Sequence, residues 1–269
     1  MLDQNLVFAL ANSILLAAGV YFMTRPSKKK TEALKGCKFY YFPVAARGDA
    51  HRLALTIAKV KFTNHKVFPM SAWADMKPLA PWNSLPYLEL ANGTVLGQSR
   101  AVLRFIGKGC SMYPTDALLA ARVDECLDGV DDMNATANKT GQGLSGDEKL
   151  AKRGEACKEG GDIYNACRRV EACYERAGTA GPYLTGELTI ADLTVFAQVG
   201  WCVSGFFDGV SAELLKPFPR LQAVRQAVFA LPEVAAYYKA EKGETYMEAV
   251  VGGNKLGDCY ERMLSSSSA

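Results

Sequence analysis

The sequence predicts an α/β domain followed by an all-helical domain, with one apolar segment ahead of both. Between residues 37 and 112, short runs rich in aromatic and β-branched residues alternate with helical spacing. From residue 116 onward, apolar side chains recur at helical spacing alone. An uncharged run precedes both parts and meets a basic cluster at its end. We therefore divide the chain into residues 1–30, 37–112, 116–245 and a tail, 246–269.

Charge argues against a nucleic-acid binder. The chain has 269 residues and a formal net charge of +3. Its first 30 residues hold four basic residues, Arg25 and Lys28 to Lys30, against one acidic residue, Asp3. This local excess equals the charge of the whole chain, so the remainder is formally neutral. Nucleic-acid binders need a basic face on their folded part.

Cysteine and histidine usage predicts neither a metal centre nor a disulfide framework. The chain has eight cysteines and two histidines. No two cysteines have the C-x-x-C spacing typical of zinc sites. A chain of this length, with 49% apolar residues, can build a core without covalent cross-links. We expect reduced, partly buried thiols and no bound metal.

Residues 6–23 predict a single transmembrane signal-anchor. The run is uncharged, and a helix of this length spans about 27 Å, close to the hydrocarbon thickness of a bilayer. A cleavable signal peptide needs preceding positive charge, but only Asp3 stands there. A mitochondrial presequence would be amphipathic and Arg-rich, and this run is neither. A buried core helix is seldom apolar on all sides and then followed directly by such a basic cluster. Because positive charge favours the cytoplasmic side, we expect the folded part there, in a membrane that the sequence does not identify.

The order of elements in residues 37–112 is that of a thioredoxin-like domain. The aromatic run 38–42 reads as a strand that Pro43 ends, and residues 52–60 have helical spacing. Asn92-Gly93 is typical of a hairpin turn, and Ser99 is typical of a helix N-cap. The other expected strands are residues 66–68, 85–90 and 94–96.

Four segments resemble sigma-class-like glutathione transferases. Tyr41-Phe42-Pro43 opens the first, which runs to residue 52, and the second has the family's W-x-x-x-K pattern. The third ends in a hydrophobic residue and Pro86, and the fourth, Gln98-Ser99-x-Ala-Val, is similar to Q-S-x-A-I. Further likeness in the helical half extends the resemblance to about residues 37–240. The four segments are residues 41–52, 72–77, 83–86 and 98–102.

The resemblance implies that Tyr41 is catalytic and that glutathione is the co-substrate. The thiol of glutathione is mostly protonated at neutral pH, while the thiolate is the nucleophile. A hydroxyl that donates to the sulfur favours the charged form, by about 1.5–3 kcal/mol. The alternative is that Tyr41 merely fills a strand, like Tyr40.

The resemblance also implies a set of glutathione-binding residues. Leu85, before a cis Pro86, would pair its backbone with the cysteinyl part, and Ser84 stands beside it. Gln98 and Ser99, at a helix N-terminus, would bind the γ-glutamyl carboxylate. In a homodimer, one residue of the opposite subunit would reach the amino group. The remaining implied residues are Arg47, beside the tyrosine; Trp73 and Lys77, for the glycyl carboxylate; and Asp128, from the opposite subunit.

Each implied role has a structural alternative. Ser99 could be a plain N-cap, Arg47 could pair with Asp49, and Asp128 could belong to a solvated face or a cation site. Trp73 and Lys77 could lie in a solvated loop. Three positions depart from the family pattern and put affinity in doubt: Asn83, Ser84 and Gly97.

Two functions remain open from the sequence. The first is a glutathione transferase acting on a small apolar electrophile, a peroxide or an isomerisable substrate. Its expected cleft between the domains is lined by Val44, Met112, Tyr113 and Met133. The second is a catalytically silent subunit of this fold, anchored in a larger membrane complex.

Thr189 and Asp192 have the spacing of a capping box, which is a folding role.

Overall fold

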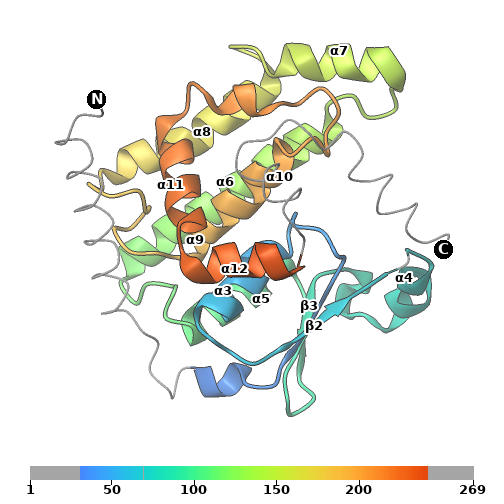
Figure 1. The fold of residues 1–269 in the computed structure, drawn as a ribbon, viewed down its shortest axis with the longest axis vertical. Coiled ribbons are helices and arrows are strands. Elements are labelled where there is room, and N and C mark those ends of the chain that lie inside the picture. Colours follow the sequence, from blue (N-terminus) through green and yellow to red (C-terminus); the bar gives the residue numbers. More distant parts are fainter. Residues whose placement is uncertain (1–30, 69, 242–269) are drawn as a thin grey trace.

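The computed structural model describes residues 31–68 and 70–241 (Figure 1). The expected signal-anchor at residues 6–23 and the tail at 246–269 lie outside these residues. Within the described part, none of the helices is both long enough and apolar enough to cross a membrane.

A four-stranded sheet forms the first half, in the order β2-β1-β3-β4. The central strand β1 pairs with β2 in parallel and with β3 in antiparallel orientation. Residues 66–68 were expected to form the second strand, but that strand lies earlier, so this prediction is wrong in position. Its four residues are polar and mostly exposed at the sheet edge, which hides the usual apolar signal. The strands are β1 Lys38–Tyr41, β2 Thr63–Lys66, β3 Tyr87–Glu89 and β4 Val95–Leu96.

Helices α3 (Asp49–Ile57) and α5 (Ser99–Gly109) pack between the sheet and the helical half, while α4 (Met70–Met76) lies on the opposite side (Figure 1). Apolar side chains at helical spacing give α5 its buried face, with Val102, Leu103 and Ile106 inaccessible to solvent. Short 3₁₀ turns complete this half at Glu32–Leu34, Lys77–Leu79 and Pro81–Asn83.

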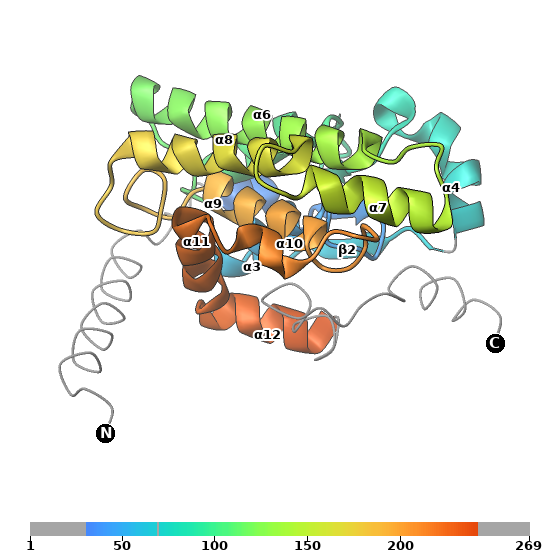
Figure 2. The same cartoon turned by 90° about the horizontal axis from the view of Figure 1, so that it is seen from above.

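The second half is helical throughout (Figure 2). Gly160 and Gly161 lie at a break between two helices, because one helix ends at Ala156 and the next begins at Asp162. The helices are α6 Ala117–Lys139, α7 Gly146–Ala156, α8 Asp162–Ala177, α9 Ile190–Thr194, α10 Gly200–Cys202, α11 Pro219–Phe229 and α12 Pro232–Glu241, with a π-helical turn at Val195–Val199 and a 3₁₀ turn at Ala212–Leu215.

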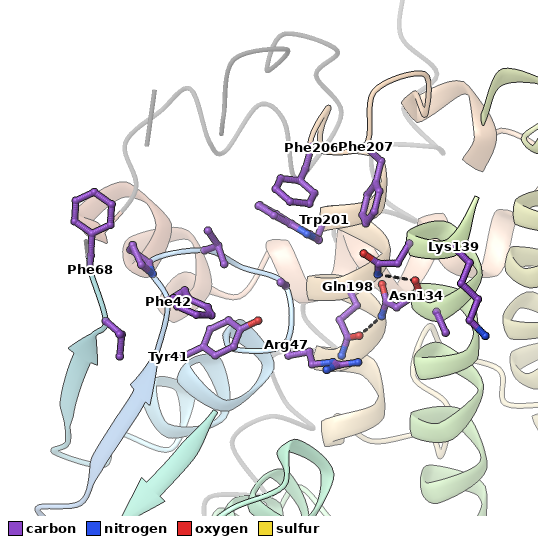
Figure 3. Close-up of a pocket in the computed structure, with 16 residues that line it drawn as sticks. Tyr41, Phe42, Arg47, Phe68, Asn134, Lys139, Gln198, Trp201, Phe206 and Phe207 are labelled. Carbon is purple, nitrogen blue, oxygen red and sulfur yellow. Dashed lines mark hydrogen bonds between the residues drawn. The ribbon is translucent and has the colours of Figure 1, made fainter. Parts of the chain in front are cut away.

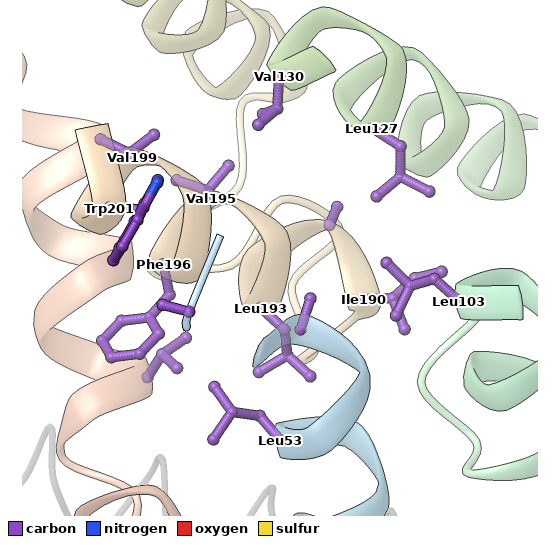
Figure 4. Packing of buried hydrophobic residues seen from close by; sticks show 14 of the residues in the cluster. Leu53, Leu103, Leu127, Val130, Ile190, Leu193, Val195, Phe196, Val199 and Trp201 are labelled. Atoms are coloured by element: carbon purple, nitrogen blue, oxygen red, sulfur yellow. The ribbon is translucent and has the colours of Figure 1, made fainter. Parts of the chain in front are cut away.

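Helix α9 is the centre of the core that joins the two halves (Figure 4). Ile190 and Leu193 are fully buried and meet Leu53 of α3 and Leu103 of α5. The π-helical turn continues this apolar surface. The two halves therefore share one core, which fixes the end of β1 relative to the helices.

The expected capping box at the start of α9 is confirmed. The Thr189 N–H donates to Asp192 Oδ2 at 2.8 Å, and the Thr189 hydroxyl accepts from the Ala191 N–H at 3.3 Å. Asp192 also accepts from the Leu184 N–H and from the Tyr174 hydroxyl. Burial raises the pKa of Asp192 to about 6, although these hydrogen bonds lower it.

Candidate functional site

Tyr41 borders a cavity of about 560 Å³ where the two halves meet (Figure 3). It is the last residue of β1, and the chain turns away directly after it. Its side chain is 7% exposed, and its hydroxyl points toward the helical side of the cavity, where Gln198 lies. Strand β1 thus presents a nearly buried phenol to a largely apolar cavity.

The cavity wall is largely apolar, with six aromatic side chains, two cations and three amides. The sheet side contributes the β1–α3 turn and the residues after β2. The helical side contributes the end of α6 and the segment from the π-helical turn to the loop after α10. Arg47 and Lys139 supply the positive charges. The aromatic and amide residues are Tyr41, Phe42, Phe68, Asn134, Asn138, Gln198, Trp201, Phe206 and Phe207.

The expected lining of this cleft is mostly wrong. Val44 does line the cavity. Met112 and Met133 are instead core residues, with exposures of 6% and 0%. The Tyr113 hydroxyl donates to Asp124 of α6 at 2.9 Å, away from the cavity. The aromatic run at Trp201, Phe206 and Phe207 takes their place and could have been noticed in the sequence as a candidate wall.

The Tyr41 hydroxyl stays protonated at neutral pH. Burial raises its pKa above the ordinary value of 10.0, and the backbone of Arg47 and the charges of Arg47 and Arg52 offset this only in part. A protonated phenol is a hydrogen-bond donor. Tyr41 can therefore donate to an anionic acceptor in the cavity without giving up its proton.

Arg52 holds the turn that carries Tyr41. This fully buried guanidinium donates to the backbone oxygens of Phe42 at 2.7 Å and Val44 at 2.8 Å. It also donates to Asp49 Oδ1 at 3.0 Å. The alternative pairing of Arg47 with Asp49 is therefore wrong, because Asp49 is buried against Arg52 and the Tyr238 hydroxyl. Arg47 is exposed at the cavity wall instead.

Gly48 leaves the space in which the Tyr41 ring lies. A Cβ at this position would approach Tyr41 Cδ1 to 2.3 Å and Arg52 Nη1 to 2.9 Å. We expect Gly48→Ala to displace the ring. If Tyr41 has the catalytic role that the resemblance implies, glutathione-dependent turnover should fall by roughly tenfold or more, since misplacing a catalytic group by about 1 Å can cost this much. The measurement is steady-state turnover at saturating glutathione.

Gly129→Ala is the matched control for this substitution. Gly129 lies within α6, and a Cβ there would meet nothing within 4 Å. It should leave turnover unchanged and raise stability slightly, because alanine favours helix over glycine. Unchanged turnover in both variants would show that the position of the Tyr41 ring does not matter.

The implied glutathione-binding residues meet at the same end of the sheet. The Leu85–Pro86 peptide bond is cis, as the resemblance implies. Gln98 has a positive φ of 67° and immediately precedes α5. The N-cap position belongs to Gln98, so the expectation that Ser99 caps this helix is wrong. The Ser99 hydroxyl oxygen is buried and has no hydrogen-bond partner among the described residues.

His51 ties this helix start to α3, which the sequence did not reveal. Its Nε2 lies 2.8 Å from the Ser99 backbone oxygen, and its ring stacks on Phe39 with centroids 5.0 Å apart. Burial lowers the pKa of His51 to about 4, so the imidazole is neutral at pH 7. The neutral ring can donate one proton to the Ser99 carbonyl.

The other implied binding residues lie near this end with fewer contacts. Trp73 is half-buried, and its ring meets Phe42 edge-on at 6.1 Å. Lys77 is exposed in the 3₁₀ turn after α4, and Ser84 is half-buried. The Gly97 departure has a steric reason, because a Cβ there would lie 2.8 Å from Trp82 Cδ1.

Asp128 does not line the cavity of its own chain. It is exposed on α6, with Oδ1 3.5 Å from Arg104 Nη2. Arg104 makes a closer contact, 2.6 Å, with Asp124.

A partly buried polar network beside the cavity was missed in the sequence. Arg100, in the first turn of α5, donates to both oxygens of Asp131 at 2.5 and 2.7 Å. The Gln198 amide lies within hydrogen-bond distance of both Arg100 and Asn134. The network joins the start of α5 to the cavity wall.

Among the described residues, no group of three or more histidine, cysteine or acidic side chains could hold a metal ion.

Comparisons with known proteins agree with this arrangement. Residues 146–241 match the family described as "Glutathione S-transferase, C-terminal domain". An S-crystallin of Nototodarus sloanii is 26% identical over 216 residues, which cover 77% of this chain and 97% of that protein. A probable glutathione S-transferase of Caenorhabditis elegans is 29% identical over 209 residues, covering 76% and 96%.

Solved structures show the same fold. A sigma class glutathione S-transferase of Fasciola hepatica superposes with a TM-score of 0.64 at 22% identity. The match covers 78% of this chain and 99% of that one. The chain therefore has the glutathione S-transferase fold, and its residues 146–241 match the C-terminal domain of that family.

Proposed function

We propose that the chain is a sigma-class-like glutathione transferase in which the Tyr41 hydroxyl donates a hydrogen bond to the glutathione sulfur. The observation that carries this proposal is the protonated, nearly buried phenol at the wall of an apolar cavity. A hydrogen bond to the thiolate lowers the thiol pKa and raises the fraction of the nucleophile at neutral pH. Low water access strengthens this bond.

Glutathione would lie across the end of the sheet. Its γ-glutamyl carboxylate would face the first turn of α5, where the Ser99 hydroxyl and helix N–H groups supply donors. The Leu85 backbone would pair with its cysteinyl part, next to Ser84 and Gln98. Its glycyl carboxylate would face Trp73 and Lys77. Arg47 would lie beside the thiolate.

The second substrate would occupy the aromatic cavity. Phe68, Trp201 and Phe206 favour an apolar group, while Arg47 and Lys139 favour a substrate with an acceptor or a negative charge. Conjugation, peroxide reduction and isomerisation all use the same thiolate. The proposal therefore covers these three reaction types.

Retention on immobilised glutathione, followed by conjugation of 1-chloro-2,4-dinitrobenzene, tests the proposal. The full chain, purified in mild detergent, should be retained, released by free glutathione and active in conjugation. Retention without turnover of this electrophile, of cumene hydroperoxide or of an isomerisable ketone would instead support the catalytically silent subunit. Failure to be retained would remove glutathione as the co-substrate.

A homodimer is proposed on the family resemblance, with the Gln98–Ser99 region and α6 near the two-fold axis. The exposed Asp128 could then reach the glutathione amino group of the opposite subunit. Light scattering of the detergent-solubilised chain should give twice the chain mass after subtraction of the detergent. The mass of a single chain would remove Asp128 from the site.

Membrane attachment through residues 6–23 is proposed from the sequence. Apolar burial survives high salt, whereas attachment through the basic residues 28–30 alone would be screened. The chain should stay with membranes through high-salt and alkaline washes, and protease should reach the folded part only from the cytoplasmic side. Release by salt alone would indicate a surface-bound segment and end the spanning proposal.

A further inference from the structure

Two contacts fix the register between α6 and α8, which pack side by side (Figure 2). Arg122 Nη1 of α6 donates to the Ala177 backbone oxygen of α8 at 3.4 Å. Arg176 Nη2 of α8 donates to Glu125 Oε1 of α6 at 2.7 Å. Residues near the start of α6 thus meet residues near the end of α8, so the helices run antiparallel.

This register brings two cysteines face to face. Cys126 lies four residues after Arg122, and Cys173 lies four residues before Ala177, so each is one helical turn further into the interface. Both are free thiols, with exposures of 2% and 8%. The interface therefore contains a pair of thiols from two different helices.

Cys173 also lines a second cavity, which is separate from the one at Tyr41. This cavity has a volume of about 290 Å³. Two arginines, Arg122 and Arg176, line it beside the thiol, with Glu125 as the acidic residue. Reactive cysteines lie in electropositive, partly accessible surroundings of this kind. Cys126 lies behind Cys173 and does not line the cavity.

We propose that Cys173 and Cys126 form a peroxide-reactive dithiol site that closes to a disulfide between α6 and α8. The Cys173 thiolate attacks one oxygen of hydrogen peroxide, the O–O bond breaks, and hydroxide leaves and is protonated to water. Cys173 becomes a sulfenic acid. The Cys126 thiol then attacks that sulfur, the S–O bond breaks, and a second water leaves. Two thiols are oxidised to one disulfide while one peroxide is reduced to two waters.

The ionisation of the two thiols agrees with these separate roles. The neighbouring Cys126 thiol, with the charges of Arg176 and Arg122, holds the pKa of Cys173 below its ordinary value, although burial and the charge of Glu125 raise it. The neighbouring Cys173 sulfur and burial raise the pKa of Cys126. Cys173 is thus the attacking thiolate, and Cys126 is the thiol that resolves the sulfenic acid.

Two other pairs of neighbouring thiols provide internal controls. Burial raises the pKa of Cys110 to about 12, next to Cys37, and raises the pKa of Cys202 to about 12. Cys167 lies close to Cys202, and burial raises its pKa as well. Each of these thiols is at most 1% exposed, compared with 8% for Cys173. In both pairs the two thiols lie close together, as Cys126 and Cys173 do. None of the four thiols, however, lines the cavity that Arg122 and Arg176 line.

The test follows every cysteine of the full reduced chain, kept in mild detergent, during exposure to hydrogen peroxide. Samples are quenched with N-ethylmaleimide at intervals, digested and mapped by mass spectrometry. Free Cys173 should disappear at least about tenfold faster than Cys110 or Cys167. A linked Cys126–Cys173 peptide should accumulate, and dithiothreitol should restore both thiols.

Two variants separate the steps. In Cys126→Ala, the Cys173 sulfenic acid should persist and be trapped by dimedone, because its resolving thiol is absent. In Arg176→Gln, the loss of Cys173 should slow severalfold. The proposal is overturned if Cys173 of the unaltered chain reacts no faster than Cys167, or if oxidised chain contains no Cys126–Cys173 link. Both of these outcomes are read from the unaltered chain, so neither depends on the folding of a variant.

Discussion

Tyr41→Phe should lower turnover roughly ten- to a hundredfold while glutathione binding is retained. The substitution removes one hydroxyl from a ring that is 7% exposed, so the packing at the end of β1 is preserved. A hydrogen bond to a charged group is worth about 1.5–3 kcal/mol, which corresponds to this range of rates. The loss should appear in kcat, because the thiolate is needed for the chemical step.

Tyr40→Phe is the matched control on the same strand. The Tyr40 side chain points to the opposite face, where its hydroxyl donates to Glu89 Oε2 at 2.9 Å and its ring stacks on Tyr87. Removing that hydroxyl should leave turnover within about twofold of the parent. Equal losses in the two variants would mean that the strand is merely destabilised, and no loss in Tyr41→Phe would mean that another donor activates the sulfur.

Asp192→Ala should lower the free energy of unfolding by about 3–5 kcal/mol, more than any other substitution proposed for this chain. The carboxylate is fully buried and accepts from the Leu184 and Thr189 N–H groups and from the Tyr174 hydroxyl. Its removal leaves these buried donors without a partner, and each costs about 1–3 kcal/mol. Urea unfolding followed by circular dichroism measures the effect.

Asp116→Ala is the matched control, because Asp116 caps α6 through one exposed hydrogen bond to the Leu119 N–H at 2.9 Å. It should cost about 1 kcal/mol. A loss for Asp192→Ala that is no larger than this would contradict the buried network. Such a result would leave Asp192 with no more than an ordinary capping role.

The pH dependence of Asp192 follows from its raised pKa. The folded value is about 6 and the ordinary value is 3.8, so the folded chain binds the extra proton between these pH values. The stabilisation that comes from this extra proton is therefore fully present below about pH 3.8 and is lost as the pH rises through about 6, while the hydrogen bonds to the carboxylate remain. Asp192→Asn should remove this slope when its unfolding free energy is compared with that of the parent.

Local signals in the sequence predicted the parts of the fold that depend on a few adjacent residues. The strand expected at residues 38–42 is found at Lys38–Tyr41, and the expected capping box at Thr189 and Asp192 is found as well. In both cases, the residue types carry the information themselves, because an aromatic run and a Thr-x-x-Asp spacing have few alternative conformations. The cis bond at Pro86 is also found, but it was expected from the family resemblance.

Other parts depend on contacts that local patterns do not contain. Strand β2 is polar because it lies at a sheet edge, so its position is set by pairing with β1. Ser99 has the usual chemistry of an N-cap, but Gln98 takes that position in a left-handed conformation. In both cases, residue type alone did not give the position of the residue in the fold.

Within one helix, too, the sequence pattern does not show which residue faces the cavity. Met133 is fully buried in the core, while the next residue, Asn134, lines the cavity. One step along an α-helix turns the side chain by about 100°, so an uncertainty of one residue exchanges core and cavity. The orientation of α6 is set by its packing on α8 and α9, which lie at least 23 residues away in sequence.

The thiol pKa of bound glutathione is the most direct test of the proposed role of Tyr41. It can be measured from the ultraviolet absorbance of the thiolate, titrated in the complex with the parent and with Tyr41→Phe. We expect the thiol pKa in the parent complex to lie below that of free glutathione, and to rise by roughly one to two units in the variant. Identical thiol pKa values in the two complexes would contradict activation by Tyr41.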